Sequence, residues 1–167
     1  MQPVVRRLIA VAALLTGLAA TSASASAATT PLVPVHSQQA IKKRTNLYAF
    51  VPTRLGFGFG YYAWKFEPGG KPALRIWFRN RLERSHEITF VVTPQTGPCA
   101  QGKEKSFQLD GNKVYWSQRA GEQQAWRCVP SPVNGKQIRL TAATSMRPLT
   151  FAGAGLGRMV ASGRWVR

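Results

Sequence analysis

The feature that most constrains the fold is a pair of neighbouring segments in which apolar and polar residues alternate. The first segment reads LRIWFRN at residues 74–80, and the second reads EITFVV at residues 87–92. A period of two puts every second side chain on the same face of a β-strand, so each segment has one apolar face. A hairpin that turns around Glu83 aligns the two apolar faces and sets Arg79 opposite Glu87, a favourable cross-strand pair. A shift by one residue would bury the arginines, so the sequence predicts an antiparallel hairpin in this register.

A second hairpin is predicted by turn residues within the segment KSFQLDGNKVYWS at residues 105–117. Asp, Gly and Asn at 110–112 separate two alternating runs, as expected for a tight β-turn. A turn at residues 111–112 pairs Leu109 with Val114 and Phe107 with Trp116, and a neighbouring turn position is the alternative.

Other strands are indicated at residues 47–51, 56–66, 125–129 and 137–143. The one helical candidate is the segment at residues 150–163. In that segment Thr150 suits the N-cap of a helix and Gly163 suits its C-terminal end. Leu156, Met159 and Val160 share one face. These elements predict a mainly β or α+β fold, in which an antiparallel sheet of about five to seven strands carries one short C-terminal helix.

The start of the chain has the pattern of a secretory signal peptide at residues 1–27. Arg6 and Arg7 precede an apolar run at residues 8–20, and small residues follow, with cleavage expected after Ala25 or Ala27. The apolar run is shorter than the ~20 residues that a membrane-spanning helix needs. Residues 28–46 contain prolines and the basic run Lys42-Lys43-Arg44, and we expect a flexible basic leader there, followed by one globular domain at residues 47–167.

The two cysteines, Cys99 and Cys128, are expected to form one disulfide bond, because an exported protein matures in an oxidising environment. A signal peptide and a disulfide together predict a secreted or cell-envelope-associated protein. Neither a C-x-x-C motif nor the ligand spacing of a zinc site is present, so we expect no metal.

Catalytic chemistry has little support in the residue pattern. The chain has only 6 acidic residues and 2 histidines, and His86 lies between Ser85 and Glu87, which point to the opposite face of a strand. The glycine-rich segments GFGFG and GAGLG lack the spacing of a nucleotide-binding loop, so no cofactor is expected. The residue pattern therefore favours a non-enzymatic protein but does not exclude an enzyme.

Charge is the strongest remaining signal. Loss of the signal peptide removes 2 of the 23 Lys and Arg residues, which against 6 acidic residues leaves a net charge of +15. Such an excess favours polyanions through counterion release and electrostatic steering. A tryptophan between two arginines suits stacking combined with bidentate contacts to phosphate or carboxylate, and two further arginines extend the patch. The candidate ligand-binding residues are Arg75, Trp77, Arg79, Arg81 and Arg84.

Two ordinary structural roles compete with this interpretation. Arginine on the exposed face of a strand also keeps a sheet soluble, and Trp77 could simply lie under a loop. Tyr61, Tyr62 and Trp64 could enlarge an aromatic surface, although core packing is the usual role of crowded aromatic residues.

The sequence thus predicts a secreted binding or envelope-associated protein with a basic, aromatic surface for an anionic polymer. The polymer could be a wall polymer, an acidic glycan, anionic lipid headgroups or extracellular DNA. One alternative is a secreted protein–protein module, such as an inhibitor, that uses an exposed loop at residues 117–124. A small hydrolase that uses His86 is a third alternative.

The segments FVPTRLGFGFGYYAWKF, GEQQAWRCV and LGRMVASGR resemble parts of small exported proteins of high-GC bacteria that have no assigned activity. This resemblance implies an exported single domain over residues 47–167, and it implies no functional residues.

Overall fold

The computed structural model describes residues 31–45, 48–55, 58–102, 104–119, 121–145 and 152–166. The expected signal peptide and its cleavage sites lie outside the described residues, and so does Thr150. In the described part of the chain, no helix combines the length and the apolar character that crossing a membrane requires.

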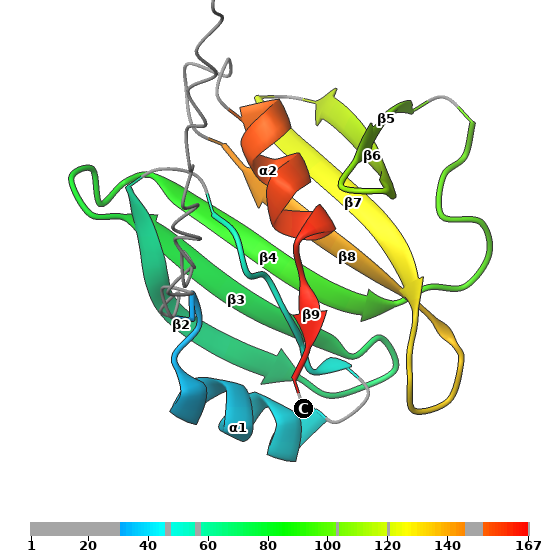
Figure 1. Ribbon diagram of the computed structural model, residues 1–167, viewed down its shortest axis with the longest axis horizontal. Helices are drawn as coiled ribbons and strands as arrows, with labels where there is room; N and C mark the ends of the chain where they lie inside the picture. Colours follow the sequence, from blue (N-terminus) through cyan, green and yellow to red (C-terminus); the bar gives the residue numbers. More distant parts are fainter. Residues whose placement is uncertain are drawn as a thin grey trace, which may run out of the picture.

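One antiparallel sheet of seven strands dominates the molecule, in the order β2-β3-β4-β8-β7-β6-β5 (Figure 1). A single disulfide bond and a short C-terminal helix complete the predicted architecture. The strands of the sheet are β2 (Phe59–Glu67), β3 (Ala73–Asn80), β4 (Glu87–Pro94), β5 (Lys105–Leu109), β6 (Asn112–Arg119), β7 (Glu122–Pro130) and β8 (Gln137–Thr144).

Strands β3 and β4 confirm the hairpin expected from the alternating pattern. Leu74, Ile76 and Phe78 are fully buried on one face, and Arg79 pairs with Glu87 in the predicted register. The buried face continues across the neighbouring strand β8 through Leu140. One face of the sheet therefore forms the core, and the other face is open.

The hairpin of β5 and β6 forms as expected, but its predicted register is wrong. Leu109 pairs with Asn112 and Phe107 pairs with Val114, because the turn uses residues 110 and 111. Both turn residues have positive φ values, 50° for Asp110 and 73° for Gly111. Two left-handed residues match the twist of a two-residue hairpin, which selects this turn over the alternative at residues 111–112.

The exposed loop expected at residues 117–124 is instead part of a hairpin. Strand β6 continues through Arg119 and strand β7 begins at Glu122. Gln123 is buried, and Ser117 pairs with Gln124 across the two strands. The described residues of this segment therefore belong to strands and a turn, and not to the exposed loop that the inhibitor alternative expected.

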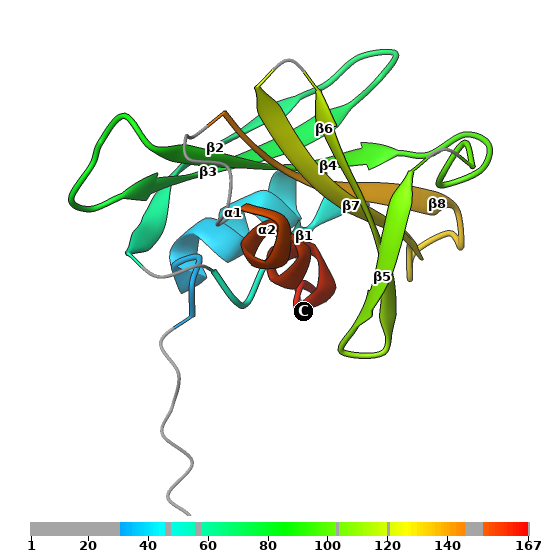
Figure 2. The ribbon, with the colours of Figure 1, turned by 90° about the horizontal axis from the view of Figure 1, so that it is seen from above.

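The expected C-terminal helix is confirmed as α2 (Ala152–Ala161). It covers the core face of the sheet, with Leu156, Met159 and Val160 buried against it. Figure 2 shows α2 on the same side of the sheet as the N-terminal helix α1 (Val35–Thr45). Arg127 of strand β7 points into this layer and donates through Nε to the carbonyl oxygen of Val160, at 2.6 Å. Burial lowers the pKa of Arg127, and a cation at the C-terminus of a helix is favourable.

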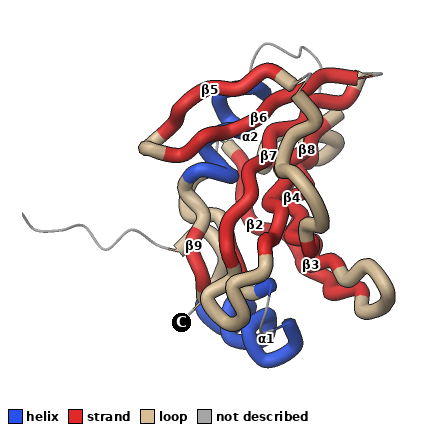
Figure 3. The backbone as a smooth tube through the Cα atoms, turned by 90° about the vertical axis from the view of Figure 1, so that its right-hand side faces the viewer, coloured by secondary structure: helices blue, strands red, loops and turns tan. Residues whose placement is uncertain are grey.

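The flexible leader expected at residues 28–46 is not a loose arm where the structure describes it. Residues Val35–Thr45 form helix α1, and Ile41 is fully buried in the core together with Val33. Gln38 donates from its side-chain amide to the carbonyl oxygen of Val33, at 2.6 Å. The folded domain therefore begins before residue 47, and α1 lies at the opposite end of the molecule from β5 and β6 (Figure 3).

A second, two-stranded sheet joins segments from the two ends of the described chain. Of the strand expected at residues 47–51, the described part is shorter than predicted, because only β1 (Phe50–Val51) pairs with β9 (Arg164–Trp165). The Phe50 ring packs edge-on against Trp165, with ring centres 5.2 Å apart. This pairing fastens the C-terminal segment to the core beside α2.

Candidate anion-binding surface

Three of the five predicted ligand-binding residues lie together on the open face of the sheet. Arg75, Trp77 and Arg79 alternate with buried core residues along β3, and each is half-buried. The period of two in the sequence therefore predicts their orientation correctly.

Both arginines of this strand already have carboxylate partners. Arg75 Nε donates to Glu67 at 3.0 Å, and Arg79 donates to Glu87 at 3.3 Å. The hydrogen bond from Arg75 holds the pKa of Glu67 below its ordinary value, with burial opposing the shift and Lys65 adding to it. Most of the charge on this strand is thus balanced within the sheet.

Arg79 also stacks on an aromatic ring at the edge of the sheet. Its guanidinium carbon lies 3.7 Å from the ring centre of Tyr62, which is 55% exposed. A register shift in β2 between Tyr61 and Ala63 makes Tyr62 the extra residue of a bulge, which redirects its side chain. The Nε atom of Arg79 is buried and has no hydrogen-bond partner among the described residues.

The loop from β3 to β4 holds Arg81 and Arg84 at the same edge. The side-chain oxygen of Asn80 accepts hydrogen bonds from the backbone N–H groups of Leu82 and Glu83, at 2.8 and 3.1 Å. The backbone N–H of Arg81 donates to the carbonyl oxygen of Gly58, at 3.0 Å. These bonds fix the loop on strand β2, as an Asx turn does.

The side chain of Arg81 lies over strand β2, where a glycine leaves room for it. A Cβ atom at Gly60 would come within 3.4 Å of Arg81 Nε. Arg84 is exposed like Arg81, and neither forms an ion pair with any residue of the described chain. Two guanidinium groups are therefore unneutralised at this edge.

These side chains surround a shallow cavity of about 740 Å³, which we name the arginine pocket. Its wall includes the N-terminal segment before α1 as well as the edge strand and the loop. The lining residues are Leu32, Pro34, Gly60, Tyr61, Tyr62, Arg79, Asn80, Arg81 and Arg84.

The five predicted ligand-binding residues do not all line one cavity. Arg79, Arg81 and Arg84 come together in the arginine pocket, whereas Arg75 lines a separate cleft in the middle of the open face. Trp77 lines neither cavity. From the sequence, no role was predicted for Asn80 or for the N-terminal segment, although an Asn directly after an alternating strand pattern indicates a turn.

Catalytic and metal-binding arrangements are not apparent around His86. Its Nδ1 contacts a carboxylate oxygen of Glu83 at 2.6 Å, at the base of the same loop. Within the described ranges, no group of three or more His, Cys, Asp or Glu residues is placed to hold a metal ion.

Comparisons with known proteins identify no relative: no family model, no curated protein and no solved structure matches this chain.

Proposed function

We propose that this chain is an exported, envelope-associated binding protein that holds an anionic polymer at the arginine pocket. The observation that carries the proposal is the convergence of three guanidinium groups and two tyrosine side chains on one cavity. Guanidinium groups bind phosphate and carboxylate through paired, charge-assisted hydrogen bonds. The exposed ring of Tyr62 offers a flat surface on which a sugar or base can stack.

The distribution of charge over the molecule supports the same role. Four acidic residues already pair with basic side chains or histidine: Glu67, Glu83, Glu87 and Asp110. A polymer with many anionic groups is attracted by the whole cationic surface and is held at the pocket by direct contacts. Among the residues whose burial the structure describes, the exposed basic ones that form no ion pair are Lys42, Lys43, Arg44, Lys71, Arg81, Arg84, Lys105, Lys113, Lys136, Arg158 and Arg164.

The test compares two double variants that remove the same charge. Arg81→Ser/Arg84→Ser changes the pocket, whereas Lys71→Ser/Lys136→Ser removes two exposed cations from turns that do not line it. Binding to glycerol-phosphate teichoic acid, polygalacturonate and DNA is measured for each protein across a salt titration.

The pocket variant is expected to bind at least one polymer about ten-fold more weakly at physiological salt, a loss of ~1.4 kcal/mol. The control variant is expected only to lower the salt slope by about two units, as two lost cations require. If both variants lose affinity equally for every polymer, the charge acts generally and the pocket is not a site.

A further inference from the structure

A second cavity, of about 320 Å³, lies beside the disulfide bond, and we name it the disulfide cleft. It is bounded by the loop from β4 to β5 on one side and by strands β7 and β8 on the other. The cavity volume falls at the lower end of the range that is usual for small-molecule sites. Gln95, Gln101, Glu104, Glu122, Gln124 and Arg139 supply its polar wall.

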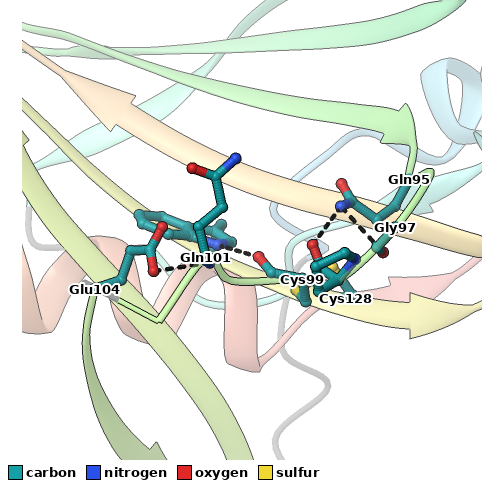
Figure 4. The surroundings of a disulfide bond; sticks show 8 residues. Gln95, Gly97, Cys99, Gln101, Glu104 and Cys128 are labelled. Atoms are coloured by element: carbon teal, nitrogen blue, oxygen red, sulfur yellow. Dashed lines mark hydrogen bonds between the residues drawn. A yellow bond between two sulfur atoms is a disulfide. The ribbon is translucent and has the colours of Figure 1, made fainter.

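The loop that forms this wall is held in place before any ligand arrives. Cys99 is bonded to Cys128 of strand β7, with Cα atoms 5.8 Å apart. Trp126, which is 3% exposed, donates from its indole N–H to the carbonyl oxygen of Cys99 at 3.0 Å, and Gln95 donates to Pro98 at 2.8 Å. The Glu104 carboxylate accepts the backbone N–H of Gln101 at 2.9 Å (Figure 4). Such a wall needs little reorganisation on binding.

The disulfide cleft differs from the arginine pocket in the sign of its charge. Two of the 6 acidic residues of the chain line it, Glu104 and Glu122, against one cation, Arg139. A polyanion is therefore disfavoured here, and a ligand that bears a positive group is favoured.

Two charged groups in this cleft retain unused binding capacity. The guanidinium carbon of Arg139 lies 4.5 Å from the ring centre of Trp126, and the nearby Glu104 carboxylate attracts its charge. The N–H groups of Arg139 donate no hydrogen bond to a described residue, so they are free to bind a carboxylate. The carboxylate of Glu122 is exposed, with neither a hydrogen bond nor an ion pair to any side chain that the structure describes. The cleft thus has a guanidinium group at Arg139 that can donate hydrogen bonds and a carboxylate at Glu122 that can accept them.

The separation of these two ends sets the length of the ligand. Arg139 pairs with Cys128 across β7 and β8, and its guanidinium group lies over the ring of Trp126. Trp126 is four residues along β7 from Glu122. Four residues of strand span ~13 Å, so side chains that project from these two positions can hold charged groups about 10–13 Å apart. An extended chain of three residues spans about 10 Å. Gln124 lies between the ends on the same face and offers an amide to a peptide backbone.

We propose that the disulfide cleft binds a short, extended peptide of about three residues with both ends free. The ammonium group of the peptide lies at Glu122, and its carboxylate lies at Arg139. This site is independent of the polyanion surface, so the Arg81→Ser/Arg84→Ser variant is expected to keep it.

The test is calorimetric titration of the complete, disulfide-bonded protein with tri-alanine. N-acetylated tri-alanine and tri-alanine amide serve as matched probes that each lack one charge. Both capped peptides are expected to bind at least ten-fold more weakly than tri-alanine. Glu122→Gln is expected to remove the preference for the free amine, and Arg139→Gln the preference for the free carboxylate.

Glu83→Gln, an exposed acidic residue outside the cleft, is the control and is expected to bind like the unmodified protein. Should Arg139→Gln fail to fold, the exposed position Glu122 still tests the amine end. Absence of tri-alanine binding at millimolar concentration overturns the proposal. Equal affinity for free and capped peptides also overturns it, as does preferential binding of a neutral trisaccharide.

Discussion

The ring of Phe50 is seated against the backbone of Gly163, where the C-terminal segment leaves helix α2. A Cβ atom at Gly163 would lie only 2.8 Å from Phe50 Cζ, closer than side chains normally approach. Gly163→Ala is therefore expected to destabilise the fold by about 1–3 kcal/mol, the usual cost of overpacking. The free energy of unfolding in urea measures this change.

Gly70 provides the matched control, because a Cβ atom there would meet nothing within 4 Å. Gly70→Ala is expected to leave stability unchanged or to raise it by up to ~1 kcal/mol, since alanine restricts the unfolded chain. Equal stability of the Gly163→Ala protein and the unmodified protein would contradict the packing of Phe50 described above.

The ion pair between Glu67 and Arg75 makes stability depend on pH. The folded state lowers the pKa of Glu67, so its contribution is present above the unfolded pKa and is lost as the pH falls through the folded pKa. As the pH falls from about 5 to about 3, the range around the ordinary pKa of Glu, the free energy of unfolding is expected to decrease. In urea titrations, the Glu67→Gln protein is expected to lose less unfolding free energy over this pH range than the unmodified protein. An equal loss in both proteins would show that Glu67 does not cause the pH dependence.

At the residue scale, the sequence predicts which side chains of β3 face the core and also predicts the pairing of Arg79 with Glu87. Both follow from strand periodicity, which is a local property. The stacking of Arg79 on Tyr62 is not predictable in this way, because it depends on a bulge in another strand.

Among the elements, the loop from β4 to β5 depends most on one covalent bond. The bond between Cys99 and Cys128 joins residues 29 positions apart, and removing it is expected to cost about 3–4 kcal/mol of stability in the chain-entropy model. Urea unfolding of the Cys99→Ser/Cys128→Ser protein measures the loss. Unchanged stability would mean that the loop is held without the disulfide bond.

Helix α1 shows why some elements escape prediction. Apart from Ile41, the helix contributes polar residues to the interior, including Ser37, Gln38 and Thr45, so the sequence has no clear apolar stripe. Its burial depends on tertiary contacts with strand β2, which local helix propensity does not reveal. The β5–β6 register was missed for a smaller reason, since both turns place Gly111 within the hairpin.

For the whole molecule, the net charge is predictable from composition, but its placement is not. Glu67 and Glu87 pair with arginines on the open face, and Glu104 and Glu122 line the disulfide cleft, so the open face is nearly balanced. The uncompensated cations lie on the loops, the helices and the outer strands. A polyanion is consequently expected to bind along the edge of the sheet rather than across its open face.

Hydrogen exchange of the complete protein, with and without saturating glycerol-phosphate teichoic acid, tests this account most directly. We predict slower exchange at residues 58–62 and 80–86, which form the arginine pocket, and unchanged exchange at the turns that carry Lys71 and Lys136. Protection spread evenly over all the basic loops, or confined to the open face around Arg75 and Trp77, would contradict it.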